Sequence, residues 1–183
     1  MSEQTQKAYC LFCRTGDEQK IAAAVNERFP QLQAMTPLRI LAEKRQGKWE
    51  DRTLTLLPGY VFVYADDELP YDLRYKTHNL YKVLHYERGI RALTGPDADY
   101  AGWLFRHRGR IGTSKVLEVG SRIEIVDGPL KDFGGKIVKL DKHKRRAWIE
   151  FDFEGSKRTV SISADCLQDP TEAAARPERV AAS

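Results

Sequence analysis

The pattern of apolar and polar positions divides the chain into a mixed α/β first part and a β-rich second part. The apolar run at residues 8–14 predicts a buried strand, and Ile21 and Val25 then recur at helical spacing. Thr15 stands three residues before Glu18, and this spacing predicts a capping box, in which each side chain bonds an unpaired backbone N–H at the start of the helix.

Alternation and turn residues predict the rest of the first part. Two alternating segments, 38–40 and 53–56, flank the turn at 46–48 and predict a β-hairpin. The run 60–64 is the strongest strand signal of the chain, because aromatic and β-branched residues favour strands. Further elements are a short helix within 67–77, extended chain at 80–86, and a helix that opens at Pro96 and ends at Gly109.

The second part contains short strand signals that turns separate. We expect strands at 122–126, 135–140, 147–153 and 158–162. Strands this short expose their edges unless the sheet closes, so a small β-barrel is predicted. Glycine and basic residues without any acid at 106–115 predict a linker, and the composition of 170–183 predicts a disordered tail. The expected organisation is a first domain at 1–107, a basic flexible linker at 108–116, a barrel domain at 117–169 and a tail at 170–183.

Composition and charge narrow the class of protein. The chain has no run of about 18 apolar residues, which a membrane-spanning helix needs. Its first residues lack the pattern of a secretory signal, and three cysteines are too few for a disulfide framework, so a cytoplasmic protein is expected. The net charge of +4 comes entirely from residues 1–116, since residues 117–183 carry equal numbers of acidic and basic side chains.

The usual signatures of enzymes are missing from the sequence. Cys10 and Cys13 have no second ligand pair for zinc, and an odd separation on a strand places them on opposite faces. Gly134-Gly135-Lys136 lacks the other residues of a phosphate-binding loop. We therefore expect no catalytic residue, no metal ligand and no cofactor.

Three segments in order carry a family resemblance: Tyr9–Gly16, Leu57–Val63 and Gly128–Lys136. Together they resemble the NusG family of transcription elongation factors, and the third resembles the KOW motif. The resemblance implies an α+β protein, with an NGN-like antiparallel sheet flanked by helices followed by a small SH3-like β-barrel. The segments Arg14-Thr15-Gly16 and Asp141–Ala147 look most like those of the antiterminator branch called LoaP.

The family's binding residues can be matched to positions of this chain. Its first domain binds the clamp helices of RNA polymerase, and Tyr60 and Phe62 match the two aromatic residues that contact the polymerase. Their spacing places both on one strand face, where they also suit an ordinary core. Val83 matches a third polymerase contact. Phe153 matches an aromatic residue that relatives present to a ribosomal protein or termination factor, although it equally suits the core of the barrel.

Three further positions agree with or depart from the family pattern. Gly135 matches the glycine of the KOW motif, which is expected where backbones pack closely. Asp132 stands where glycine is frequent, a change expected to alter only the turn. The segment Pro70–Arg74 replaces a His-Thr-Thr motif with which the relative RfaH makes a second polymerase contact, so that contact does not transfer.

A basic cluster at the end of one expected strand is the candidate nucleic-acid contact. The cations between residues 136 and 146 face a single acid, and the candidates for binding RNA are Lys142, Lys144, Arg145 and Arg146. A solvated turn is the alternative.

The leading interpretation is a monomeric, non-enzymatic regulator of transcription elongation that promotes antitermination and contacts nascent RNA or a partner protein. The alternatives are a housekeeping elongation factor that couples polymerase to a ribosome or termination factor, and an RNA-binding or ribosome-assembly protein.

Overall fold

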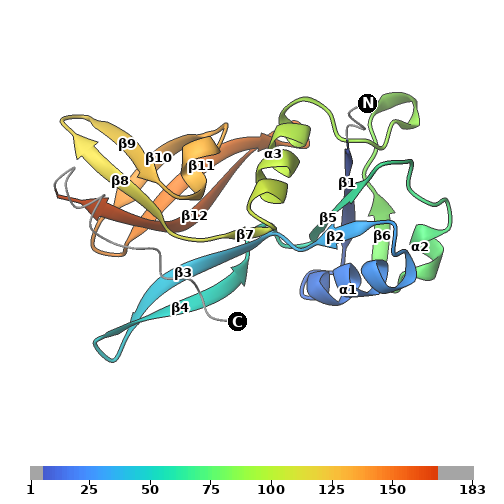
Figure 1. Ribbon diagram of the computed structural model, residues 1–183, viewed down its shortest axis with the longest axis horizontal. Coiled ribbons are helices and arrows are strands. Elements are labelled where there is room, and N and C mark those ends of the chain that lie inside the picture. The colour runs from blue at the N-terminus through green and yellow to red at the C-terminus, as the bar shows by residue number, and fades with distance from the viewer. Residues whose placement is uncertain (1–5, 169–183) are drawn as a thin grey trace.

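The computed structural model describes residues 6–168, so the predicted tail at 170–183 lies outside the described residues. The first part contains a four-stranded sheet in the order β2-β5-β1-β6 (Figure 1). Strand β1 (Lys7–Cys13) lies between β5 (Tyr60–Ala65) and β6 (Leu80–Val83), antiparallel to both, and β2 (Gln33–Met35) pairs with the other edge of β5. The first part also contains the helices α1 (Glu18–Arg28), α2 (Leu73–Lys76) and α3 (Gly95–Arg106), and a short 3₁₀ turn η1 (Glu87–Gly89).

The two faces of this sheet belong to two different hydrophobic clusters. Val61 and Val63 face the cluster that includes α1, whereas Phe62 and Tyr64 face the cluster that includes α3. Strand alternation explains this division. Cys10 and Cys13 also fall into different clusters, which confirms that they lie on opposite faces.

The capping box predicted at α1 is wrong. The helix begins at Glu18 after Asp17, with no side-chain cap. The buried carboxylate of Glu18 instead accepts hydrogen bonds from the backbone N–H of Gly16 at 3.0 Å and of Gly59 at 2.7 Å. Glu18 therefore ties the start of the helix to the turn that leads into β5.

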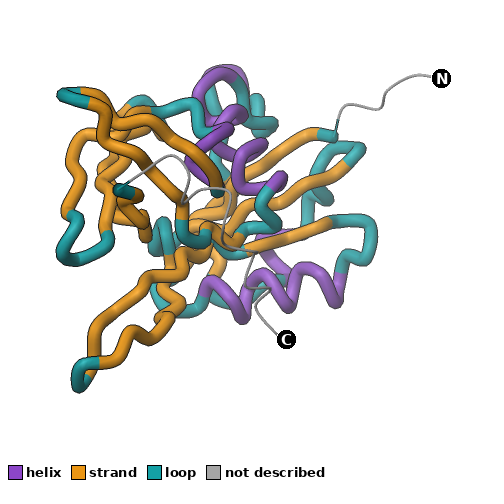
Figure 2. The backbone as a smooth tube through the Cα atoms, turned by 60° about the vertical axis from the view of Figure 1, so that its left-hand side comes forward, coloured by secondary structure: helices purple, strands orange, loops and turns teal. Residues whose placement is uncertain are grey.

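The predicted hairpin is confirmed and forms an arm of its own, which Figure 2 shows projecting away from the body. Strands β3 (Leu38–Arg45) and β4 (Lys48–Thr55) pair around the turn at Gln46 and Gly47, both with positive φ. At its base, β3 also pairs with the short parallel strand β7 (Arg110–Ile111). The expected flexible linker at 108–116 is therefore structured, because Ile111 is fully buried and its backbone extends the hairpin sheet.

The second part is a five-stranded sheet in the order β10-β11-β12-β8-β9. The strands are β8 (Ser114–Val119), β9 (Arg122–Asp127), β10 (Lys136–Asp141), β11 (Arg146–Phe153) and β12 (Ser156–Leu167), with the 3₁₀ turn η2 (Pro129–Asp132) after β9. Within residues 6–168, β9 and β10 do not pair with each other, so the sheet is a half-barrel and not the closed barrel that was predicted. Helix α3 packs against β11 of this sheet and so covers part of the half-barrel.

One hydrophobic cluster spans both parts of the chain. Phe62 and Trp103 from the first part lie in the same cluster as Ile149 and Phe151 from the second, and all are at most 7% exposed. The two parts are therefore packed together, and α3 stands between the two sheets (Figure 1).

Gly135 supplies a test of the packing inside the half-barrel. A Cβ there would lie 2.3 Å from the carbonyl oxygen of Glu150 and 2.4 Å from the ring of Phe133. We expect Gly135→Ala to lower the free energy of unfolding by about 1–3 kcal/mol, the usual cost of overpacking, in urea denaturation. Gly134→Ala is the matched control, because a Cβ at Gly134 meets nothing within 4 Å. Equal stability of the two variants would contradict the close approach.

Candidate functional site

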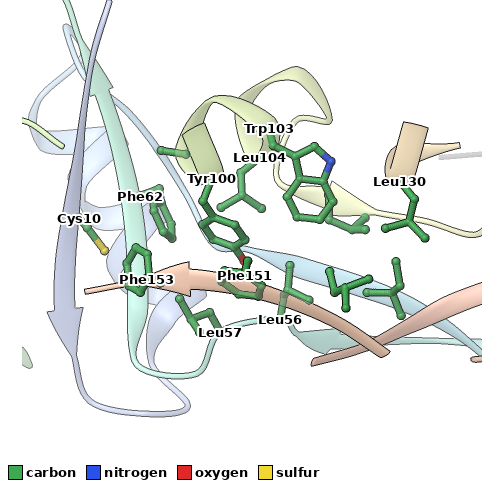
Figure 3. Packing of buried hydrophobic residues seen from close by; sticks show 14 of the residues in the cluster. Cys10, Leu56, Leu57, Phe62, Tyr100, Trp103, Leu104, Leu130, Phe151 and Phe153 are labelled. Carbon is green, nitrogen blue, oxygen red and sulfur yellow. The ribbon is translucent and has the colours of Figure 1, made fainter. Parts of the chain in front are cut away.

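The two aromatic residues proposed as polymerase contacts form a face that the second part of the chain covers. Tyr60 is half-buried and Phe62 fully buried, and both side chains point to the same side of β5. Phe153, at the end of β11, packs on both: its ring centroid lies 5.3 Å from that of Tyr60 and 5.7 Å from that of Phe62. Figure 3 shows the contact of Phe153 with Phe62. The structure therefore brings Tyr60, Phe62 and Phe153 together, although they were assigned to different partners.

Hydrogen bonds hold the turn that carries Phe153 in place. The hydroxyl of Tyr60 donates to Glu154 Oε2 at 2.5 Å, and the backbone N–H of Glu154 donates to Asp97 Oδ1 at 2.9 Å. Tyr86 donates to the other oxygen of Asp97 at 2.6 Å. Burial, and then the Glu154 carboxylate, raise the pKa of Tyr60 to about 12, so its hydroxyl remains a donor at neutral pH.

A second group of contacts joins α3 to the half-barrel. Trp103 donates its indole N–H to the carbonyl of Pro129 at 2.7 Å, and Tyr100 stacks on Phe151 at 4.3 Å. Asp132 lies 2.5 Å from Arg106 Nε and 2.7 Å from His107 Nε2. Burial opposes ionisation of Asp132, but its hydrogen bonds to Arg106 and His107 outweigh this and keep the pKa below its ordinary value. The expectation that Asp132 alters only the turn is therefore wrong, because its carboxylate links the two parts.

Val83 does not join the aromatic face. It lies opposite Leu11 in the register of β1 and β6, and it packs against the cluster on the α1 side of the sheet. Phe12 and Tyr81 extend the aromatic face instead, because Phe12 lies 5.4 Å from Tyr60 and 5.8 Å from Tyr81. Strand alternation in residues 8–14 was the available signal for Phe12, whereas the position of Tyr81 depends on strand pairing.

The four predicted RNA-binding residues differ in their exposure and in their contacts with other side chains. Lys142 forms an ion pair with Glu118, and Lys144 is exposed. Arg145 is half-buried, contacts Asp165 with two hydrogen bonds of 2.5 and 2.7 Å, and lies over the ring of Trp49 at 4.8 Å.

Arg146 reaches across to the first part of the chain. Its Nη1 donates to the carbonyl of Ala42 on the hairpin at 2.6 Å, and the side chain is half-buried. The two arginines of the predicted basic cluster therefore contact the hairpin, whereas Lys142 and Lys144 are exposed on the turn.

Groups for metal or redox chemistry are not assembled in the described part of the chain. No cluster of three or more His, Cys, Asp or Glu side chains in residues 6–168 has the arrangement of a metal site. The cysteines are unpaired, and burial raises the pKa of the Cys13 thiol to about 11 and that of Cys10 well above its ordinary value. No helix within these residues has the length and apolar character to cross a membrane.

Comparison with known proteins gives consistent relatives. Residues 6–95 match a family model described as NusG, transcription termination factor nusG. The transcription termination/antitermination protein NusG of Buchnera aphidicola is 25% identical over 171 residues, which cover 87% of this chain and 93% of that protein.

Two solved structures are also similar. One, described as the domain interaction in Thermotoga maritima NusG, covers 88% of this chain and 96% of its own, with 17% identity and a TM-score of 0.48. The other, an MjSpt4:Spt5 complex, covers 86% of this chain and 99% of its own, with 20% identity and a TM-score of 0.30. The sequence matches agree with the resemblance: residues 6–95 are similar to the NusG family model, and most of the chain is similar to a NusG protein.

Proposed function

We propose that the chain is a non-catalytic regulator of transcription elongation that binds RNA polymerase through the aromatic face at Tyr60 and Phe62. The second part of the chain contacts nascent RNA, and the complex promotes processive antitermination. The match of residues 6–95 to a NusG family model, and the similarity to the NusG protein of Buchnera aphidicola, support a role in transcription. The likeness of Arg14-Thr15-Gly16 and Asp141–Ala147 to the LoaP branch favours antitermination over the housekeeping role.

The observation that carries this proposal is an aromatic strand face, half-buried at Tyr60 and fully buried at Phe62, whose cover comes from a distant part of the chain. Phe62 is buried by Phe153, the last residue of β11, and not only by its own domain. Both interpretations of Tyr60 and Phe62 then hold, each in a different state. They are core residues while the two parts are packed, and they form a binding surface once the parts separate.

Polymerase binding therefore requires opening. When only a fraction of the molecules is open, the apparent dissociation constant equals the intrinsic constant divided by that fraction. Contacts that close the chain weaken polymerase binding, and their loss strengthens it. Partner contact by Phe153 has the same requirement, because this side chain is 0% exposed in the closed chain.

Truncating Phe153 is expected to open the chain. Phe→Ala substitutions in packed sites cost about 3–5 kcal/mol, and here the lost contacts are those between the two parts. Phe153→Ala should increase the radius of gyration in small-angle X-ray scattering while circular dichroism retains its β signal. Val138→Ala, at a site that is 46% exposed on the same sheet, is the control. An unchanged scattering profile would show that Phe153 does not hold the chain closed.

Polymerase affinity should respond in opposite directions to changes on the two sides of this contact. Truncating an interface anchor costs about 2 kcal/mol or more, so Tyr60→Ala with Phe62→Ala together should weaken binding by about several hundredfold. Phe153→Ala should tighten it. The measurement is a titration of purified polymerase with each full-length variant, after thermal unfolding has shown that the variant is folded.

Ile90→Ala, at an exposed apolar site of the first part, controls for nonspecific loss of surface. A folded double variant that binds polymerase with unchanged affinity would overturn the proposed interface.

A further inference from the structure

The hairpin arm and the half-barrel meet at a seam that is rich in arginine. We call the contact of Arg39, Ala42 and Trp49 with Arg145, Arg146 and Ser161 the hairpin seam. Arg39 Nη1 donates to the carbonyl oxygen of Ser161 at 2.5 Å and to its hydroxyl at 2.9 Å. In Figure 1 the hairpin lies beneath the sheet that contains β12.

Two of the three arginines at this seam lack an acidic partner. Arg39 and Arg146 form no ion pair with another residue in the range 6–168, and they donate only to neutral oxygens. Burial, and then Arg146, lower the pKa of Arg39, while burial, and to a smaller extent Arg145, lower that of Arg146. Glu43 raises the pKa of Arg146, but its carboxylate forms ion pairs with Arg45 and Arg52.

Unsatisfied polar atoms mark the same place. The Nε of Arg39 and the hydroxyl of Ser163 are buried, and neither has a hydrogen-bond partner among the described residues. Ser163 follows Ser161 by two positions on β12, so both side chains point to the same side of the strand. Buried donors without acceptors are costly, so these two atoms are destabilising in the closed chain.

Exposed cations and an aromatic ring surround the seam. Lys44 and Lys48 on the hairpin and Lys144 on the turn are exposed, and none forms an ion pair within residues 6–168. Trp49 is 42% exposed and lies opposite Lys44 in the register of the hairpin. The cations therefore continue from one part of the chain to the other across the ring that Arg145 covers.

A phosphodiester backbone is the anion that fits this arrangement. Its charges repeat along the strand, so several cations can each meet a phosphate, and neutralising them releases counterions. Guanidinium groups offer paired donors to phosphate oxygens, and an exposed tryptophan offers a surface on which a base can stack. A single small anion would use the arginines but not the lysines on either side.

We propose that the hairpin seam is a composite nucleic-acid site, in which Arg39, Lys44 and Lys48 of the first part act together with Lys144 and Arg146 of the second. This inference rests on the proposed nucleic-acid contact of the second part and extends it to the hairpin. The backbone phosphates bridge the two parts, and Arg145, which is held by Asp165, supports the turn.

The test uses the full-length chain, a fluorescently labelled RNA hairpin of mixed sequence and a DNA duplex of the same sequence. Binding is measured by fluorescence anisotropy at several salt concentrations. Lys44→Ala with Lys48→Ala should lower the slope of log K against log salt by about 1.4 to 1.8, since each lost phosphate contact contributes about 0.7 to 0.9. Stronger binding of one probe identifies the source of the phosphates.

Lys20→Ala with Lys82→Ala is the matched control, because it removes the same charge from the first part at exposed sites away from the hairpin. A control with an unchanged slope, beside a reduced slope for the hairpin variant, supports the proposal.

Three other outcomes overturn it. An unchanged slope for the hairpin variant, with binding lost when Lys144 is replaced by Ala, restricts the site to the second part and leaves the proposed function intact. Tighter binding by the hairpin variant shows that the hairpin competes with nucleic acid for the turn. A wild-type chain that binds neither probe overturns both this inference and the RNA contact in the proposed function.

Discussion

The packing of Phe153 on Tyr60 and Phe62 is the contact on which the rest of the structure depends. It places a residue of the half-barrel against the strand face that is proposed to bind polymerase, and so it decides which surface the molecule presents. The surrounding polar contacts of Glu154, Asp97 and Tyr86 orient this turn, whereas the aromatic rings supply most of the buried apolar area. An apolar contact of this kind gains stability in proportion to the area it hides, so a partner that hides the same rings can replace it.

The closed chain has two seams of different chemistry. At the aromatic seam, Tyr60, Phe62 and Tyr100 pack against Phe151 and Phe153, and the buried hydroxyl of Tyr100 has no partner within residues 6–168. At the hairpin seam, Arg39 and Arg146 donate hydrogen bonds to neutral oxygens. Apolar surface favours a protein partner at the first seam, and uncompensated positive charge favours a polyanion at the second.

Much of the fold could be predicted from local pattern, but the docking of the two parts could not. Alternation identified β5 and the hairpin, and it placed Cys10 and Cys13 on opposite faces. Strand β8 was missed because its start lies in a basic, glycine-containing stretch typical of linkers. The partners of Phe153, Asp132 and Arg146 are distant in sequence. The local sequence around each residue is the same whether its side chain faces solvent or another part of the chain.

The two seams lie at opposite ends of one strand. Strand β11 runs from Arg146 at the hairpin seam to Phe153 at the aromatic seam, a span of about 23 Å at the usual rise per residue. If the proposed opening were a rotation of the half-barrel about the Arg146 end, it would move Phe153 away from Tyr60 and Phe62 and break the contacts of α3, while the hairpin contact persisted. Nucleic acid held at the hairpin seam and polymerase bound at the aromatic face are then compatible in one molecule. Any free-energy coupling between them is reciprocal, because each partner shifts the same closing equilibrium. Nucleic acid at the hairpin seam therefore helps polymerase binding where it favours the open chain, and opposes it where it favours the closed chain.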